Sequence, residues 1–139
     1  MDARGHAAIV TGGGSGLGAA TAVALAGAGA KVAIFDVNLD GAKAVAGKIG
    51  GLAIKCDVTD ADAAAAAVKE ARDKHGAARI LVNCAGIGTP RRIVGRDGPM
   101  PLAEFEKVIK VNLIGTFNLM RLVAADMQGL PPLEEGERG

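Results

Sequence analysis

TGGGSGLG, residues Thr11–Gly18, is the strongest indication of the fold in this sequence. An apolar strand candidate at residues 7–10 comes directly before it, and a helix candidate runs from about residue 16 to residue 27. Glycines at such a junction allow a tight turn, keep Cβ atoms away from a bound pyrophosphate, and let the helix start close to the sheet. The first backbone N–H groups of the helix then hold an anion. The sequence therefore predicts a phosphate-binding turn.

An acidic residue ends the second strand candidate, Lys31–Asp36. Its distance from Gly18 is close to the ~20 residues at which a carboxylate meets an adenosine ribose. A carboxylate there accepts hydrogen bonds from the ribose hydroxyls and repels a 2′-phosphate, although a helix cap or a solvated strand end is the alternative explanation. Val37 follows Asp36, and the glycine stretch holds no Arg or Lys. The pattern predicts NAD rather than NADP as the cofactor.

Strand and helix candidates alternate along the chain, which is typical of βαβ units around a parallel sheet. Further strand candidates cover residues 52–56 and 79–83, and further helix candidates cover residues 40–48 and the stretch from a cap at Thr59 or Asp60 to Lys74. These units share no side-chain consensus, which favours one open sheet over a solenoid. The right-handed crossover rule gives the strand order 3-2-1-4, with the ligand crevice between strands 1 and 4. The predicted class is α/β, a Rossmann-type doubly wound parallel sheet.

The second part of the chain begins with a stretch rich in Gly and Pro, residues 86–101, which predicts a loop. The last helix candidate starts near Leu102 and is apolar on more than one face, so it needs a cover from further sheet or from a partner subunit. Exposed sheet edges and apolar faces favour association, and we expect a homo-oligomer. We expect residues 1–128 to form a nucleotide-binding Rossmann unit and residues 129–139 to form a polar loop.

Composition excludes several classes of function. The chain has 16 Lys and Arg against 15 Asp and Glu, a formal net charge of +1, so it has no field that attracts nucleic acid. It contains no Tyr and no Trp, which removes phenol acid–base chemistry and most aromatic stacking.

The cysteines and the N-terminal residues point to an ordinary intracellular domain. Cys56 and Cys84 stand apart in the sequence, without a CxxC motif or a His cluster, so neither a metal site nor a disulfide framework is expected. The apolar run at residues 7–10 is too short for a signal peptide or a membrane span. We expect a cytoplasmic protein with no nucleic-acid and no membrane partner.

The spacing Gly12-x-x-x-Gly16-x-Gly18 resembles the TGxxxGxG loop of the short-chain dehydrogenase/reductase family. Three further stretches resemble family motifs, in the same order along the chain. They are Asp57-Val58 after the third strand, Asn83-Cys84-Ala85-Gly86 after the fourth strand, where the family has NNAG, and Asn112 in the last helix. The resemblance covers essentially the whole chain and implies hydride transfer between NAD and a secondary alcohol.

The resemblance also implies roles for these residues. Ser15 and Leu17 would contact the cofactor phosphates together with the loop glycines, Asp57 and Val58 the adenine, and Asn83, Cys84, Ala85 and Gly86 would line the backbone side of the site. Asn112 would position a water for proton relay. The resemblance implies that the family's fifth strand and its catalytic Ser, Tyr and Lys lie beyond Gly139. Residues 1–128 would then be an NAD-binding half-domain, truncated after the fourth strand and its following helix, with residues 129–139 leading to the missing fifth strand. The chain alone is therefore expected to bind cofactor without turnover. A redox role of Cys84 is the sharper alternative, but its motif holds no basic residue to activate the thiol.

The NCAG variant, the long loop after it and the stretches 112–118 and 121–124 resemble one branch of the family, the type II 3-hydroxyacyl-CoA dehydrogenases. That branch implies a 3-hydroxyacyl-CoA substrate, with hydroxysteroids accepted by some members. Arg91 and Arg92 are candidates to bind the phosphates of coenzyme A, because guanidinium groups suit phosphate, or else they form a solvated pair. The other function left open is a noncatalytic nucleotide-binding or interaction module.

Overall fold

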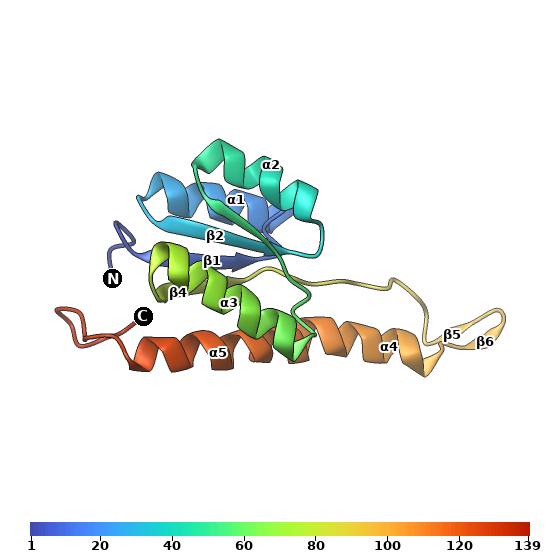
Figure 1. The fold of residues 1–139 in the computed structure, drawn as a ribbon. Coiled ribbons are helices and arrows are strands. Elements are labelled where there is room, and N and C mark those ends of the chain that lie inside the picture. Colours follow the sequence, from blue (N-terminus) through green and yellow to red (C-terminus); the bar gives the residue numbers. More distant parts are fainter.

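The computed structural model describes residues 1–139 and places a four-stranded parallel sheet between two layers of helices (Figure 1). The sheet has the order β3-β2-β1-β4, as predicted from the crossover rule. The elements of this α/β part are β1 (Ala7–Thr11), α1 (Gly16–Gly27), β2 (Lys31–Asp36), α2 (Leu39–Ile49), β3 (Leu52–Lys55), α3 (Ala61–His75) and β4 (Ala78–Asn83). Then come β5 (Val94–Gly95), β6 (Gly98–Pro99), α4 (Leu102–Ile109), the π-helical segment η1 (Lys110–Gly115) and α5 (Thr116–Gln128).

The central strand, β1, is buried along its whole length because helices cover both faces of the sheet. Val10 lies in one core beneath α1 and α2, together with Ile34 of β2. Ile9 points to the opposite face and lies in the second core, beneath α3 and α5. Neighbouring strand residues alternate between the two cores, so the apolar runs that suggested strands also explain the two helical layers (Figure 1).

The ends of α2 and α3 follow ordinary capping rules. The side chain of Asn38 accepts from the Gly41 N–H at the start of α2, and Asp60 accepts from the N–H groups of Asp62 and Ala63 at the start of α3. Gly50 ends α2 in the left-handed conformation, with φ of 63°. Of the two caps predicted for α3, the structure uses Asp60.

The prediction that residues 86–101 form only loop is wrong at its centre, where β5 and β6 form a short antiparallel hairpin. The chain reverses at Arg96 and Asp97, and Gly98 follows with φ of 112°, a conformation open to glycine. The Met100 N–H donates to the Ile93 carbonyl and extends the pairing. The hairpin was not predicted because the high Gly and Pro content of this segment is typical of a loop.

The last helix runs without a break from Leu102 to Gln128 through α4, η1 and α5. This helix is long and apolar enough to cross a membrane, but the core helix of a globular protein can meet the same criteria of length and composition. Leu119 and Val123 of this helix are buried in the core beneath the sheet. Only 22% of its most apolar window is buried, which confirms that it is apolar on more than one face. The exposed large apolar side chains of this helix are Leu102, Phe105, Leu113, Ile114, Phe117 and Met120. A cytoplasmic location and the absence of a membrane partner stay predictions.

The segment after α5, residues 129–139, contains no helix or strand and folds back beside β4. The buried Arg79 guanidinium donates to the carbonyl oxygens of Pro131, at 2.9 Å, and Arg138, at 2.7 Å. The predicted division of the chain after residue 128 coincides with the end of α5, and its meaning as a domain boundary stays a prediction.

Candidate functional site

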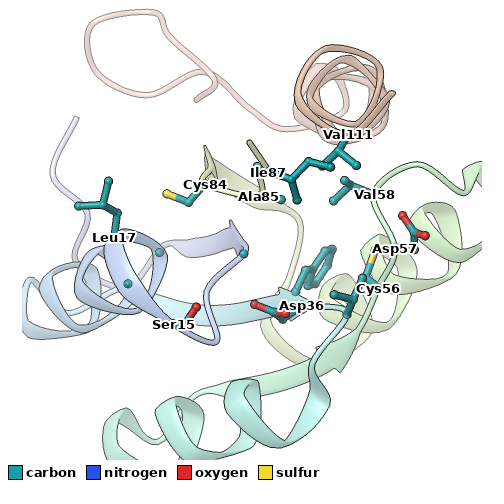
Figure 2. A pocket seen from close by; sticks show the side chains of 16 residues that line it. Ser15, Leu17, Asp36, Cys56, Asp57, Val58, Cys84, Ala85, Ile87 and Val111 are labelled. Atoms are coloured by element: carbon teal, nitrogen blue, oxygen red, sulfur yellow. The ribbon is translucent and has the colours of Figure 1, made fainter. Parts of the chain in front are cut away.

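A hollow of about 460 Å³ lies where β1, β2 and β4 end, at the crevice predicted from the strand order (Figure 2). The glycine stretch, the end of β2, the segments after β3 and β4, and one residue of η1 form its walls. The lining residues are Gly12, Ser15, Gly16, Leu17, Gly18, Phe35, Asp36, Val37, Cys56, Asp57, Val58, Cys84, Ala85, Gly86, Ile87 and Val111.

Two positions of the glycine stretch exclude any side chain. Gly12 has φ of 63°, and a Cβ atom there would lie 2.7 Å from the Ala85 backbone nitrogen. A Cβ atom on Gly18, in the first turn of α1, would overlap the Gly12 carbonyl oxygen. The turn therefore packs directly against the start of α1 and against the segment after β4, and this brings backbone atoms to the surface of the hollow.

The N-terminus of α1 has no side-chain cap, whereas the N-termini of α2 and α3 are capped by Asn38 and Asp60. Ser15 precedes α1 but makes no capping hydrogen bond, and the first turn of α1 contains no acidic residue. The N–H groups at this helix end carry a partial positive charge and need a partner. Because Ser15, Gly16, Leu17 and Gly18 all line the hollow, an anion bound there would supply that partner.

Asp36 joins the end of β2 to the glycine stretch. Its Oδ2 accepts from the Gly14 N–H at 2.9 Å, and its Oδ1 accepts from the Asn38 N–H at 2.8 Å. Each carboxylate oxygen has a further lone pair for a ligand hydroxyl. The bond to Asn38 is local, but Asn38 itself caps α2, so Asp36 is not the helix cap. The bond to Gly14 orients the Asp36 carboxylate at the edge of the hollow.

The wall after β3 carries one carboxylate and one thiol. Asp57 accepts from the N–H of Thr59 at 2.9 Å and from its hydroxyl at 2.8 Å, and these two bonds lower the pKa of Asp57. Burial, with smaller contributions from the charges of Asp57 and Asp60, raises the pKa of Cys56 to about 11. At neutral pH this wall therefore presents a negative charge beside a neutral, protonated thiol.

The wall after β4 is held from two sides. The Ala85 N–H donates to the Thr11 hydroxyl at 3.1 Å. The side chain of Asn112 accepts from the Ile87 N–H and donates to the Ile87 carbonyl, both at 2.9 Å. Asn112 does not itself line the hollow. Its backbone carbonyl oxygen accepts from the Thr116 hydroxyl at 2.7 Å. Its visible contacts fix the segment after β4.

The structure brings every residue predicted to bind the cofactor to this hollow except Asn83. Asn83 lies on the other side of β4, and its Oδ1 atom is buried without a hydrogen-bond partner. The predicted set lacked the lining residues Phe35, Val37, Cys56, Ile87 and Val111. Each stands directly beside a predicted site residue in the sequence, and extending every motif by one position would have found them.

A parallel sheet of order 3-2-1-4, with a glycine turn after its central strand and a hollow at the strand ends, defines a Rossmann-type α/β protein. Residues 6–138 match the short chain dehydrogenase family, and the chain belongs to this family. The family resemblance of the motifs is thereby confirmed.

Several proteins named for a dehydrogenase activity share this region. The chain is 39% identical over 140 residues to 3-hydroxyacyl-CoA dehydrogenase type-2 of Homo sapiens, covering 98% of this chain and 54% of the relative. It is 38% identical over 129 residues to 7alpha-hydroxysteroid dehydrogenase of Escherichia coli, covering 89% and 49%. The crystal structure of 3-hydroxyacyl-CoA dehydrogenase type-2 from Mycobacterium avium matches with a TM-score of 0.86 and 39% identity, covering 97% and 54%. The chain thus spans about half the length of these relatives.

Proposed function

We propose that this chain is the cofactor-binding half of an NAD-dependent short-chain dehydrogenase, which transfers a hydride between NAD and a secondary alcohol. The observation that carries the proposal is the junction of the glycine stretch and Asp36 at one hollow, through the Gly14 N–H. Family membership and the dehydrogenase names of the relatives support it.

The residues around the hollow fit a dinucleotide. The open start of α1, with Ser15 and Leu17, would bind the phosphates, because its N–H groups have no other cap. Asp36 would accept from the ribose hydroxyls, and its charge would repel a 2′-phosphate, which favours NAD over NADP. Asp57 and Val58 would hold the adenine. Cys84, Ala85 and Gly86 would line the remaining backbone side.

NAD, when bound, supplies the acceptor for the hydride. The chain's own part is to bind and orient it, and Asn112 would contribute by holding Ile87 at the wall of the hollow. The family's proton-transferring Tyr has no counterpart, because the chain contains no Tyr. We therefore propose that the isolated chain binds NADH without turnover, with any relay through Asn112 operating only beside a complete catalytic set.

The proposed substrate is a 3-hydroxyacyl-CoA thioester, supported by the names of the relatives. Arg91 forms an ion pair with Glu104 at 2.9 Å, which leaves Arg92 as the better candidate for a coenzyme A phosphate. We further propose a homo-oligomer that covers the exposed apolar face of α4 and α5. Sedimentation of the purified chain tests this, and a monomer at high concentration contradicts it.

Titration with NADH, followed by the emission of its nicotinamide, tests the cofactor proposal, and no Trp or Tyr of the protein interferes. We expect saturable binding, weakened by Asp36→Ala. No binding at millimolar NADH, in a chain shown to be folded by circular dichroism, contradicts cofactor binding. Oxidation of NADH by acetoacetyl-CoA with the chain alone contradicts the proposal of binding without turnover. If the full-length protein binds NADH but does not oxidise it with acetoacetyl-CoA, the alternative of a noncatalytic nucleotide-binding module is favoured.

A further inference from the structure

One residue of α5 holds the turn after β3 from outside the hollow. Asn118 is only 6% exposed, and its amide nitrogen donates to the Val58 carbonyl oxygen at 2.9 Å, with a longer contact of 3.4 Å to the Asp60 carbonyl oxygen. Between these carbonyls stands Thr59, which donates both of its hydrogen bonds to Asp57. A single side chain therefore bridges two carbonyls of the turn that presents Asp57 and Val58 to the hollow.

Arg121 determines which way the Asn118 amide faces. Its Nε and Nη2 atoms donate to the Asn118 Oδ1 atom at 3.0 and 2.7 Å. A flipped amide would set its oxygen against the Val58 carbonyl and its NH₂ group against the guanidinium, losing every one of these bonds. The orientation with the donor toward Val58 is thus the stable one, and Arg121 enforces it.

The same helical run contacts Val58 at a second point. A Cβ atom on Gly115, the last residue of η1, would lie 2.5 Å from the Val58 Cγ2 atom, so helix and turn are in close contact. Val111, one helical turn earlier, lies on the same side of the hollow as Val58 (Figure 2). The position of this helix relative to the turn therefore shapes the wall between Asp57 and Val111.

We propose that Asn118, oriented by Arg121, is a positioning residue that sets the adenine end of the nucleotide site by holding the Val58 carbonyl. The inference rests on the proposed binding of NAD, in which Asp57 and Val58 meet the adenine. Loss of the Asn118 amide leaves a buried carbonyl unpaired and frees the turn to shift. The glycine stretch and Asp36 belong to other elements and keep their own contacts.

The test compares binding of NADH with binding of deamino-NADH, which carries hypoxanthine in place of adenine. The analogue has a carbonyl where adenine has its amino group, so it lacks the donor that the proposal pairs with Asp57. We expect the unaltered chain to prefer NADH by about fivefold or more, the value of one hydrogen bond. Asn118→Leu, which keeps the number and branching of the side-chain heavy atoms, removes most of this preference, and Arg121→Met removes part of it. Arg96→Met, in the distant hairpin, keeps it.

A general loosening of the fold weakens both ligands alike and leaves their ratio unchanged, so the ratio separates positioning from stability. A ratio that stays at the unaltered value in Asn118→Leu overturns the inference. If Asn118→Leu does not fold, the exposed Arg121→Met decides alone by the same criterion. An unaltered chain that binds NADH without preference overturns this inference but not the proposed function. Absence of NADH binding in the folded, unaltered chain overturns both.

Discussion

Replacement of Gly18 by Ala is expected to destabilise the chain and to abolish cofactor binding. The new Cβ atom would overlap the Gly12 carbonyl oxygen and lie 2.7 Å from the Gly12 carbonyl carbon and 3.0 Å from the Gly13 Cα atom. All three neighbours are backbone, so no side chain can rotate away. Overpacking of this kind costs roughly 1–3 kcal/mol, and we expect the upper end here. Better helix propensity returns at most about 1 kcal/mol.

A net loss of about 2 kcal/mol lowers Tm by roughly 8 °C in a domain of this size. Thermal unfolding followed by circular dichroism at 222 nm measures it. Gly47→Ala is the matched control, because Gly47 lies exposed in α2 with no atom near its Cβ position. That variant gains helix propensity alone and is expected to be about 0.5–1 kcal/mol more stable than the unaltered chain.

Cofactor binding gives a second measurement on the same pair of variants. The shift that relieves the Gly18 overlap moves α1 away from the glycine stretch and with it the proposed phosphate site, so NADH binding is lost in Gly18→Ala and kept in Gly47→Ala. Equal Tm values for the two variants, or unchanged NADH affinity in Gly18→Ala, would show that close contact between helix and turn does not build this site.

Three further predictions concern the hollow. Asp36→Ala is expected to weaken NADH binding about tenfold and to raise the ratio of NADPH affinity to NADH affinity. Asp40→Ala, the same change in the first turn of α2, is expected to leave this affinity ratio unaltered. Equal affinity ratios in the two variants contradict the role of Asp36. Because the pKa of Cys56 rises from 9.0 to about 11 on folding, the stability gained by keeping this thiol protonated is complete below pH 9 and is lost as the pH rises to 11. Urea unfolding should therefore show a loss of about 2–3 kcal/mol over this range that is missing in Cys56→Ala, and parallel pH profiles contradict it. In the native chain N-ethylmaleimide should modify the half-buried Cys84 before the buried Cys56. NADH should slow the modification of Cys84 relative to the rate in buffer without nucleotide, because Cys84 lines the hollow. Modification of Cys56 first, or an unchanged rate with NADH, contradicts this prediction.

Much of the fold could be predicted because each element carries its own signal. The glycine stretch marks the turn between β1 and α1, Asp60 caps α3, and Gly50 ends α2, all within a few residues of the element concerned. The hairpin of β5 and β6 was missed, since its strands of two residues are too short for any periodicity and its Gly and Pro content is that of a loop.

The candidate site was predicted in the same way, through motifs that end parallel strands. The carboxyl ends of parallel strands meet at one edge, so residues at those ends, such as Asp36 and Cys84, come together whatever lies between them. Asn83 breaks the rule because side chains alternate along a strand, and it faces away from the residue that follows it. Asn112 stands beside the hollow and is bonded to the backbone of Ile87, a contact that its motif alone did not indicate.

Local sequence was enough to predict the order of the four parallel strands and of the helices between them, the class of fold, and the turn and carboxylate at which a nucleotide would bind. These depend on local propensity, on glycine geometry and on the handedness of crossovers, which neighbouring residues specify. The contact that Asn118 makes with the Val58 carbonyl, across 60 residues of chain, is set only when α5 packs against the turn after β3. Such contacts arise when separate elements pack, and the partner of a buried amide is set by the distance and orientation of those elements, which no pattern along one segment records.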